Sequence, residues 1–547
     1  MSVPQSTIYV CSGVRLDSRY EHTIYFESEN LQRAFFMGKV VKQFSTYSYI
    51  RKSWNIKLQT TLEEAIKWNY LFFHNSENGK WYYYFINQVE YVNEATVELT
   101  LEMDVMQTYL FDYALLPCFV ERQHTESDEI GEHTLDEGLD LGELVINGSF
   151  EAIKFDGTTY KGSLTDLCIL ILSSLNPATG QAVKGTYMNN VYSGLGIFAV
   201  DTAFHSNLSD LLAGLEENTD AIVNIWMYPK CLVELEEVPG KTEEEVWRDD
   251  TNIIHPVVGC QDFEFPVDKN MELDGYGPEV RNKKLFTYPY NFLYCTNNTG
   301  NAGTFHYELF QHDICTFGVS GAISPDGGAH ISPQYYNGES WNWEAGITLN
   351  SYPSCAWNAD VYKMWLALNQ NQQGLTMLNS GLSIAGGAIA SIGSLATGNI
   401  LGAGAGVGGI ISGASTIANL VAQKKDMELQ PPQARGSHSS SVNVANSRNR
   451  VDFYFKSIKA EVAKVIDDYF DLYGYKINRV MTPKPLTRTF YTYTKTVGCK
   501  ITGKGDSGMC NEDLIKIESI FDKGITFWAN GNIVGDYVAC QGANLPR

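Results

Sequence analysis

The chain has little positive charge and few charged residues of either sign. Its 547 residues include 40 Lys and Arg against 63 Asp and Glu, a net charge of −23, and only 19% are charged. Because an acidic protein repels phosphate, this balance argues against a protein that grips nucleic acid. Proline is also scarce, whereas 12% of the residues are aromatic. This composition predicts a folded, β-rich chain of about three to four domains.

Sequence motifs of metal, redox and catalytic chemistry are also missing. The eleven cysteines contain no CxxC pair, the ten histidines contain no HExxH, and no GxSxG occurs. The odd cysteine count favours buried, reduced thiols over a disulfide framework. No secretion signal is visible at the start of the chain, so we expect maturation in a reducing cytoplasm. We predict no cofactor, no metal and no enzymatic activity; a cell-wall hydrolase stays open, because one sequence cannot show paired carboxylates in a cleft.

Two glycine-rich stretches resemble nucleotide-binding motifs but lack the necessary context. Residues 404–409 satisfy GxGxxG, yet they lie inside a Gly/Ala-rich apolar run rather than between a strand and a helix. Residues 498–504 copy most of a P-loop, but Gly505 stands where Mg²⁺ needs a hydroxyl. We interpret the first as part of an apolar segment and the second as a hairpin turn.

Hydrophobic periodicity predicts mainly strands and a few helices. Residues 95–103 alternate between apolar and polar side chains, which is typical of a strand with one buried face. Residues 61–68 predict a helix in which Thr61 and Glu64 have capping-box spacing. Further strands are expected at 81–86, 167–172, 221–227, 451–455 and 489–496, and further helices at 460–469 and 511–522. The fold class predicted is mainly β with some α (α+β).

Charge and composition divide the chain into four predicted parts. Nine carboxylates and one arginine in residues 121–143 indicate a solvated, mutually repelling connector. A polar Ser/Asn stretch at 436–447 is typical of a linker. The predicted parts are a tube domain formed by 1–116 and 437–547, a middle or knob domain at 117–360, and a hydrophobic loop with its linker at 361–436.

The most unusual segment is an uncharged run of sixty residues at 364–423. It contains twelve glycines between 374 and 413 and no proline. It divides into 375–395 and 400–421 around a turn at 397–399, and each half is long enough to cross a bilayer as a helix.

The side chains of this run fall into two predicted roles. Those expected to contact lipid are Leu375, Met377, Leu378, Leu382, Ile384, Ile389, Ile392, Leu395, Ile400, Leu401, Val407, Ile410, Ile411, Ile417, Leu420 and Val421. Glycines at small-xxx-small spacing, which lets helices approach closely, are Gly398, Gly402, Gly404, Gly406, Gly408, Gly409 and Gly413.

Three interpretations of this run remain open. It could be a constitutive transmembrane hairpin, although Gly and Ala make it only weakly apolar. It could be a buried helical hairpin that never leaves the protein. It could also be sheltered inside an oligomer and released into a membrane when triggered, which fits its marginal apolarity and its flanking linkers. We favour the third interpretation.

Several sequence blocks resemble a known family. Residues 102–112, EMDVMQTYLFD, resemble the DV-x-QTW/Y-x-FD signature of the tail knob, or distal tail tube, proteins of short-tailed Picovirinae/Salasmaviridae-type phages. Blocks similar to the family's others follow in order at 119–124, 134–139, 473–480 and 520–528, then Asn532-Ile533. The resemblance covers about 80–145 and 450–540 by motif and the uncharged run by position, whereas 145–360 carry no matching motif.

The resemblance implies a structural and membrane-active role. In this family the protein forms a homo-hexameric tube at the virion tail tip, assembled in the bacterial cytoplasm beside other tail proteins such as the upper tail or connector and the appendages. By resemblance, its hydrophobic loops plug the channel and then open a pore in the host cytoplasmic membrane, through which double-stranded DNA passes without specific binding. The alternatives are a tail-associated cell-wall hydrolase, a receptor-binding module without membrane activity, and a free pore-forming toxin.

Overall fold

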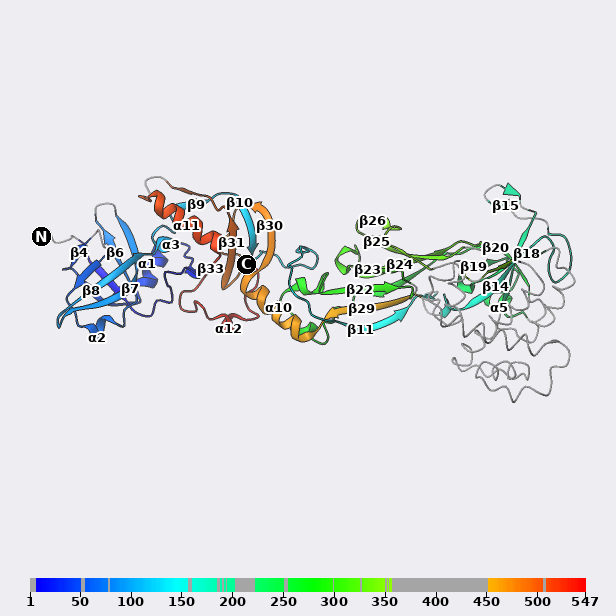
Figure 1. Ribbon diagram of the computed structural model, residues 1–547, viewed down its shortest axis with the longest axis horizontal. Coiled ribbons are helices and arrows are strands. Elements are labelled where there is room, and N and C mark those ends of the chain that lie inside the picture. Colours follow the sequence, from blue (N-terminus) through cyan, green and yellow to red (C-terminus); the bar gives the residue numbers. More distant parts are fainter. Residues whose placement is uncertain are drawn as a thin grey trace, which may run out of the picture. The chain divides into compact units, whose positions relative to one another are not determined.

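The chain folds into two compact units, each built from separate stretches of sequence (Figure 1). The first unit comprises Met1–Leu144, Glu272–Tyr290 and Ile458–Arg547, and the second comprises Val145–Met271 and Asn291–Ser457. The computed structural model describes residues 6–50, 55–76, 79–155, 160–183, 187–188, 191–192, 194–201, 222–249, 254–298, 300–324, 327–349, 352, 354–356, 451–504 and 508–547. The uncharged run at 364–423 lies outside the described residues.

The bounds of the two units differ from the predicted parts. Residues 117–144 and 272–290 belong to the first unit together with both ends of the chain, whereas the sequence placed them in a middle domain. The reason is long-range pairing, because the strand at Cys118–Gln123 lies between two C-terminal strands. The roles of tube and knob stay predictions.

An antiparallel sheet of seven strands forms one part of the first unit, in the order β3-β1-β6-β7-β8-β5-β4. Its strands are β1 (Ile8–Cys11), β3 (Val40–Phe44), β4 (Ser48–Ile50), β5 (Asn55–Leu58), β6 (Tyr70–Asn75), β7 (Lys80–Asn93) and β8 (Thr96–Met103). The alternation predicted for β8 is confirmed, since Val97, Leu99 and Leu101 are buried. Aromatic side chains from this sheet, such as Tyr70 and Phe72, enter the core.

A second sheet joins the two ends of the chain. Its order is β2-β33-β31-β10-β30, with β2 (His22–Ile24), β10 (Cys118–Gln123), β30 (Tyr475–Met481), β31 (Tyr491–Val497) and β33 (Ile525–Trp528). β2 runs parallel to β33 and the other pairs are antiparallel. The hairpin expected at 498–504 is wrong, because β32 (Ile501–Gly503) pairs with β9 (Tyr113–Leu115) rather than with β31. That segment connects two sheets.

The described helices of the first unit are α1 (Glu29–Met37), α2 (Leu62–Ala65), α3 (Val105–Thr108), α10 (Ala460–Tyr473), α11 (Asn511–Lys523) and α12 (Tyr537–Cys540). Helices were predicted at the positions of α2, α10 and α11, whereas α1, α3 and α12 were not predicted. The helix expected at 61–68 is confirmed as the short α2, but its capping box is not formed. Glu64 instead accepts hydrogen bonds from Lys42 and from the Thr60 hydroxyl, so its carboxylate does not reach back to Thr61.

The second unit is built almost wholly from antiparallel strands. Its larger sheets have the orders β11-β29-β22-β23, β19-β20-β17-β14-β18-β28 and β21-β24-β25-β26, with β27 beside β25. The strands are β11 (Leu144–Glu151), β14 (Leu167–Ser173), β17 (Gly196–Asp201), β18 (Ile222–Pro229), β19 (Val233–Leu235), β20 (His255–Cys260), β21 (Phe263–Asp268), β22 (Asn291–Thr296), β23 (Ala302–Phe305), β24 (Ile314–Gly321), β25 (Ala329–Tyr336), β26 (Glu339–Trp341), β27 (Ile347–Thr348), β28 (Ser354–Ala356) and β29 (Asp452–Ile458).

Smaller elements complete this unit. They are β12 (Ile153–Phe155) paired with β13 (Tyr160–Ser163), β15 (Tyr187–Met188) paired with β16 (Val191–Tyr192), and the helix α5 (Glu243–Trp247). The described part of both units is thus rich in sheets with few helices, and the predicted fold class, mainly β with some α, is confirmed.

Candidate functional site

The first signature block, at 102–112, forms a buried capping structure at α3. The Asp104 carboxylate accepts hydrogen bonds from the backbone N–H groups of Met106 and Gln107, each at 3.1 Å. The Tyr70 hydroxyl donates to it at 2.8 Å. Burial outweighs these bonds and raises the pKa of Asp104 to about 6. The acid therefore holds α3 against β6 rather than meeting solvent.

Gln107 links the same block to the N-terminal segment. Its side-chain amide donates to the Thr23 hydroxyl at 3.0 Å and to the Ile24 carbonyl oxygen at 2.8 Å. Gln32, on α1, donates to the Gln107 side chain at 3.0 Å. Since all these groups are buried, each needs its partner, and the block fixes how α1 and β2 lie against α3.

Buried charges join the second, third and fourth sequence blocks, at 119–124, 134–139 and 473–480. Arg122, on β10, donates to the Gly474 carbonyl oxygen at 2.6 Å and pairs with the Glu137 carboxylate. Glu137 also pairs with Lys284 and accepts the backbone N–H of Lys476 at 3.0 Å. The side chain of Glu137 has no exposed surface. Burial lowers the pKa of Lys284 against the opposing pull of Glu137.

This arrangement corrects one prediction. The acidic stretch at 121–143 was expected to be a solvated, mutually repelling connector, and at Glu137 that expectation is wrong. Arg122, from the same stretch, and Lys284, which is 147 residues away, neutralise its charge in the interior. Asp128, in the same stretch, accepts a hydrogen bond from the Tyr475 hydroxyl. The stretch is therefore fastened to the first unit.

A second buried network lies on α10. Asp467 accepts hydrogen bonds from the Tyr276 hydroxyl at 3.0 Å, from the backbone and side chain of Arg281 at 3.1 Å, and from Asn282 at 3.0 and 2.9 Å. Arg281 also pairs with Asp471 at 2.8 Å. Burial raises the pKa of Asp471 to about 6. This network ties the segment 272–290 to α10, and no sequence motif indicated it.

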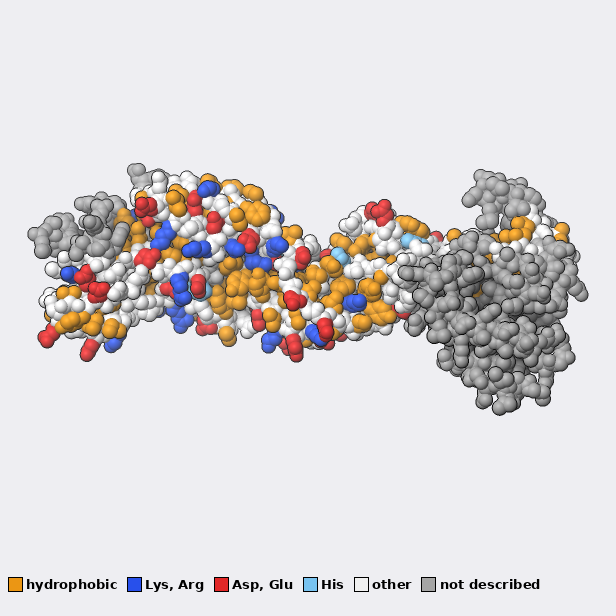
Figure 2. Space-filling model, in the orientation of Figure 1, with side chains coloured by type: hydrophobic (Ala, Val, Ile, Leu, Met, Phe, Trp, Pro, Cys, Tyr) orange, Lys and Arg blue, Asp and Glu red, His pale blue; other side chains and the backbone are white. Residues whose placement is uncertain are grey.

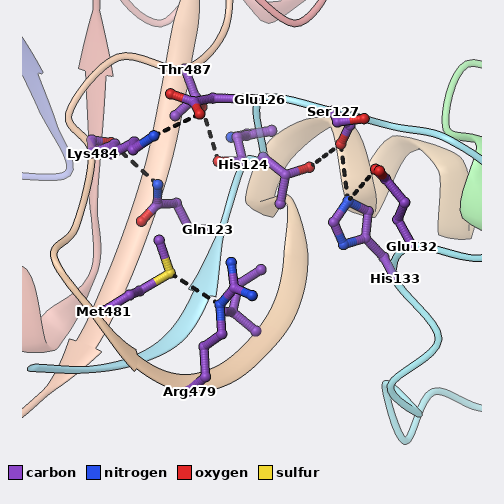
Figure 3. Close-up of a pocket in the computed structure, with 12 residues that line it drawn as sticks. Gln123, His124, Glu126, Ser127, Glu132, His133, Arg479, Met481, Lys484 and Thr487 are labelled. Atoms are coloured by element: carbon purple, nitrogen blue, oxygen red, sulfur yellow. Dashed lines mark hydrogen bonds and ion pairs between the residues drawn. The ribbon is translucent and has the colours of Figure 1, made fainter.

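A pocket of about 400 Å³ opens beside β10 and β30 (Figure 3). Its lining residues are Gln123, His124, Thr125, Glu126, Ser127, Glu132, His133, Ile477, Arg479, Met481, Lys484 and Thr487. His124 accepts the Tyr493 N–H through Nδ1 at 2.8 Å and faces the Asp471 carbonyl oxygen through Nε2 at 3.0 Å. Burial lowers the pKa of His124 to about 3. The imidazole is neutral with both nitrogens engaged, so it holds strands together.

The remaining pocket charges are also partly engaged. Lys484 pairs with Glu126 at 2.6 Å, and the His133 imidazole contacts the Ser127 carbonyl oxygen at 2.9 Å. Within the part of the chain that the structure describes, no group of three or more His, Cys, Asp or Glu side chains is placed to hold a metal ion. The side chains that line the pocket therefore hold strands and loops of the first unit together.

The residues predicted for membrane contact and for hairpin packing all lie outside the described residues, at 375–421 and 398–413. Among the residues that are described, no helix is long and apolar enough to cross a membrane. Tyr109 and Trp528, two aromatic residues of the matched blocks, are buried. Gly474 and Gly524 follow the ends of α10 and α11 with positive φ.

Comparisons with known proteins agree with this architecture. A family model for the N-terminus of the caudoviral major tail protein matches residues 4–114. The fold and this match define the class, a β-rich structural protein of a phage tail. The family model for the C-terminal domain of the tail knob protein gp9 of Bacillus phage phi29 matches residues 262–541, just over half of the chain. The chain belongs to this tail knob family.

Relatives match over nearly the whole length. Tail knob protein gp9 of Bacillus phage B103 is 24% identical, and the match covers 97% of each chain. Tail knob protein gp9 of Bacillus phage phi29 is also 24% identical, over 97% of this chain and 98% of its own. The solved structure of the bacteriophage C1 tail knob protein, gp12, shares the fold at a TM-score of 0.60 and 14% identity, covering 97% of this chain and 98% of that one.

Proposed function

We propose that this tail knob protein forms a homo-hexameric tube at the virion tail tip, through which the genome passes. The tube is assigned to the predicted parts 1–116 and 437–547, and other tail proteins would attach to it. A formal charge of −23 for each copy would repel the phosphates of double-stranded DNA and favour passage over binding.

The uncharged run at 364–423 is proposed as the membrane-active part. The observation that carries this proposal is the run itself, sixty residues without an Asp, Glu, Lys, Arg or His in a chain with 63 acids. In the assembled tube the run would plug the channel. At the host surface it would leave the tube and insert in the cytoplasmic membrane, with its glycines packing helices together and its Ile and Leu side chains facing lipid.

Two substitutions in the run test this role. Ile389→Asp combined with Ile410→Asp is expected to leave assembly intact and to abolish dye leakage from liposomes. The physical reason is the insertion penalty of about 2.5–3.5 kcal/mol for each aspartate near the centre of a membrane helix. Leakage equal to that of the wild type would contradict the proposal.

The matched control makes the same substitution elsewhere in the chain. Ile515 lies exposed on α11, so Ile515→Asp is expected to leave leakage unchanged. A loss of leakage in this control as well would point to a general effect of added charge. A zymogram with the same purified protein, run on bacterial cell walls, tests the alternative of a hydrolase.

A further inference from the structure

The pocket beside β10 and β30 contains a buried polar atom that lacks a hydrogen-bond partner. Gln123, which lines the pocket, is only 3% exposed, and its Oε1 atom accepts no hydrogen bond from any described residue. The opposite side of the amide is held, because Nε2 donates to the Lys484 carbonyl oxygen at 3.4 Å. An oxygen that has lost contact with water and gained no donor is energetically unfavourable. Gln123 therefore leaves one acceptor that an N–H or O–H group of a ligand can satisfy.

Arg479 brings unused donors to the same pocket. It lines the pocket from β30, and its Nε donates to Met481 Sδ at 3.5 Å (Figure 3). Figure 2 shows Lys and Arg side chains interspersed with Asp and Glu over the face of this unit that is in view. Within the described ranges, however, no carboxylate forms an ion pair with Arg479. Its two Nη atoms therefore present a fork of N–H groups, the geometry that binds a carboxylate at two points.

The rest of the lining narrows the chemistry of a ligand. Glu126 and Glu132 are also in the wall, so a doubly charged phosphate would be repelled more strongly than a single carboxylate. A second carboxylate, as on a free acidic amino acid, would find no second unpaired Lys or Arg in this lining, because Lys484 pairs with Glu126 at 2.6 Å. Ile477, which is buried, and Met481 offer apolar surface to methylene groups. These features favour one carboxylate joined to an uncharged donor by a short apolar linker.

We propose that this pocket binds an acidic residue of a polypeptide, with its carboxylate held at two points by the Arg479 guanidinium. The backbone N–H of the bound residue donates to Gln123 Oε1, which it reaches when the flexible side chain of Met481 turns aside. Ile477 contacts the methylene groups between the two polar ends. A glutamate within a peptide has this combination of carboxylate, methylene linker and amide N–H. The inference does not depend on the proposed tube or on membrane activity, so each stands or falls separately.

Saturation-transfer NMR, which detects weak ligands of large proteins, tests the proposal on the full-length chain. The probe is N-acetyl-L-glutamic acid α-methylamide, which has a single carboxylate. The matched control probe is the glutamine analogue, which has nearly the same shape and no charge. We expect saturable binding of the glutamate probe and at least about tenfold weaker binding of the glutamine probe. Equal binding of the two probes, or no binding of the glutamate probe, would overturn the proposal.

Substitutions then assign the binding to this pocket. Arg479→Gln is expected to weaken binding of the glutamate probe at least about tenfold. Arg33→Gln, at an exposed arginine on α1 of the same unit, is expected to bind like the wild type. Wild-type affinity in Arg479→Gln would overturn the proposal. If circular dichroism shows that this variant does not fold, Arg479→Lys decides, because lysine keeps the charge without the fork: weakened binding supports the site, and unchanged binding overturns it.

The acidic residue can come from a second copy of this chain or from another polypeptide. Sedimentation velocity with saturating glutamate probe, and with the glutamine probe as the control, distinguishes these two sources. Assemblies that dissociate only with the glutamate probe take the residue from a second copy. Assemblies that stay intact while the probe is bound take it from another polypeptide.

Discussion

Aromatic side chains pack in the cores of both units, but the first unit adds ion pairs of carboxylates that have no exposed surface, Glu137 and Asp467. In the first unit Arg122 and Glu137, both from the stretch 121–143, meet Lys284, from 272–290, in the interior. In the second unit Phe317 is buried, with its ring centre 5.0 Å from those of Phe305 and Phe453. Charge networks demand fixed partners and geometry, while apolar cores tolerate substitutions of similar size.

This difference offers a reason for the distribution of the recognisable sequence blocks. The blocks at 102–112, 119–124, 134–139, 473–480 and 520–528 all belong to the first unit. Side chains such as Gln107 and Glu137 in them make specific buried polar contacts. The sequence of 145–360 shows no such block; most of this range belongs to the second unit, but 272–290 belong to the first and supply Arg281 and Lys284 to its buried networks. If this reason is correct, the loss of one buried polar contact should strongly destabilise the first unit.

The largest expected effect comes from removing one buried charge. Glu137→Gln keeps the shape of the side chain but leaves Arg122 and Lys284 without their carboxylate. We expect the free energy of unfolding of the first unit to fall by about 3–5 kcal/mol, because unpaired buried charges are strongly destabilising. Urea denaturation and hydrogen exchange of the first unit measure the loss.

Glu143→Gln is the control for this substitution. Glu143 also pairs with a lysine, Lys459 at 2.7 Å, but its side chain is 84% exposed. We expect no measurable change in this variant, because solvent screens an exposed pair. Equal stability of both variants would show that the buried network does not stabilise the first unit.

A smaller effect is expected where a helix end touches a strand. Gly474 has φ 64° and ψ −154°, a region open almost only to glycine. A Cβ at this position would lie 2.5 Å from backbone atoms of Gln123 and His124. Gly474→Ala is therefore expected to lower the free energy of unfolding by about 3 kcal/mol.

The same substitution at Gly498 measures the cost of the backbone conformation without the steric clash. It has φ +65°, yet a Cβ there would meet no atom within 4 Å. Gly498→Ala is expected to cost only about 1 kcal/mol, from backbone conformation alone. Thermal unfolding of both variants measures the difference, and equal costs would argue against a close approach of α10 to β10.

The smallest expected effect depends on pH. The pKa of Asp104, raised to about 6 by burial, exceeds the usual value of about 3.9. The folded state therefore binds the proton more tightly than the unfolded state. The stability this provides is present below about pH 4 and lost as pH rises through about 6.

Asp104→Asn removes this pH dependence, because asparagine stays neutral and retains an oxygen for the N–H groups of Met106 and Gln107. Relative to the wild type, the variant is expected to gain about 1–3 kcal/mol between pH 4 and pH 7. Hydrogen exchange at both pH values measures this gain in the first unit. Amides of the second unit should show no difference between the two proteins; a pH-independent difference in the first unit would contradict the assignment.

Local patterns allowed much of the secondary structure to be predicted. The period-two alternation of β8 and the amphipathic pattern of α10 are properties of consecutive residues, so the sequence displays them directly. The end of α11 was predicted within one residue, whereas α10 continues to Tyr473, four residues beyond its predicted end, and stops at Gly474. The same approach was wrong for the Thr61–Glu64 capping box, since Lys42 from a neighbouring strand competes for the carboxylate.

Contacts between distant segments could not be predicted from the sequence. Nothing near Lys284 indicates that its partner is Glu137, and Arg281 is separated from Asp467 by 186 residues. The single arginine among nine acids at 121–143 was the one available signal, because an isolated Arg122 could mark a buried partner. The sequence pattern suggested repulsion there because the compensating lysine lies in another stretch.

The central claim is that the uncharged run makes this tail knob protein active on membranes. Dye release from liposomes, measured for the wild type and for a deletion of residues 374–423 over a range of pH, tests it most directly, with the oligomeric state recorded on the same samples. The account predicts release by the wild type in at least one condition and none by the deletion, with equal assembly of both. Equal release by both proteins, or no release by either in any condition, would contradict it.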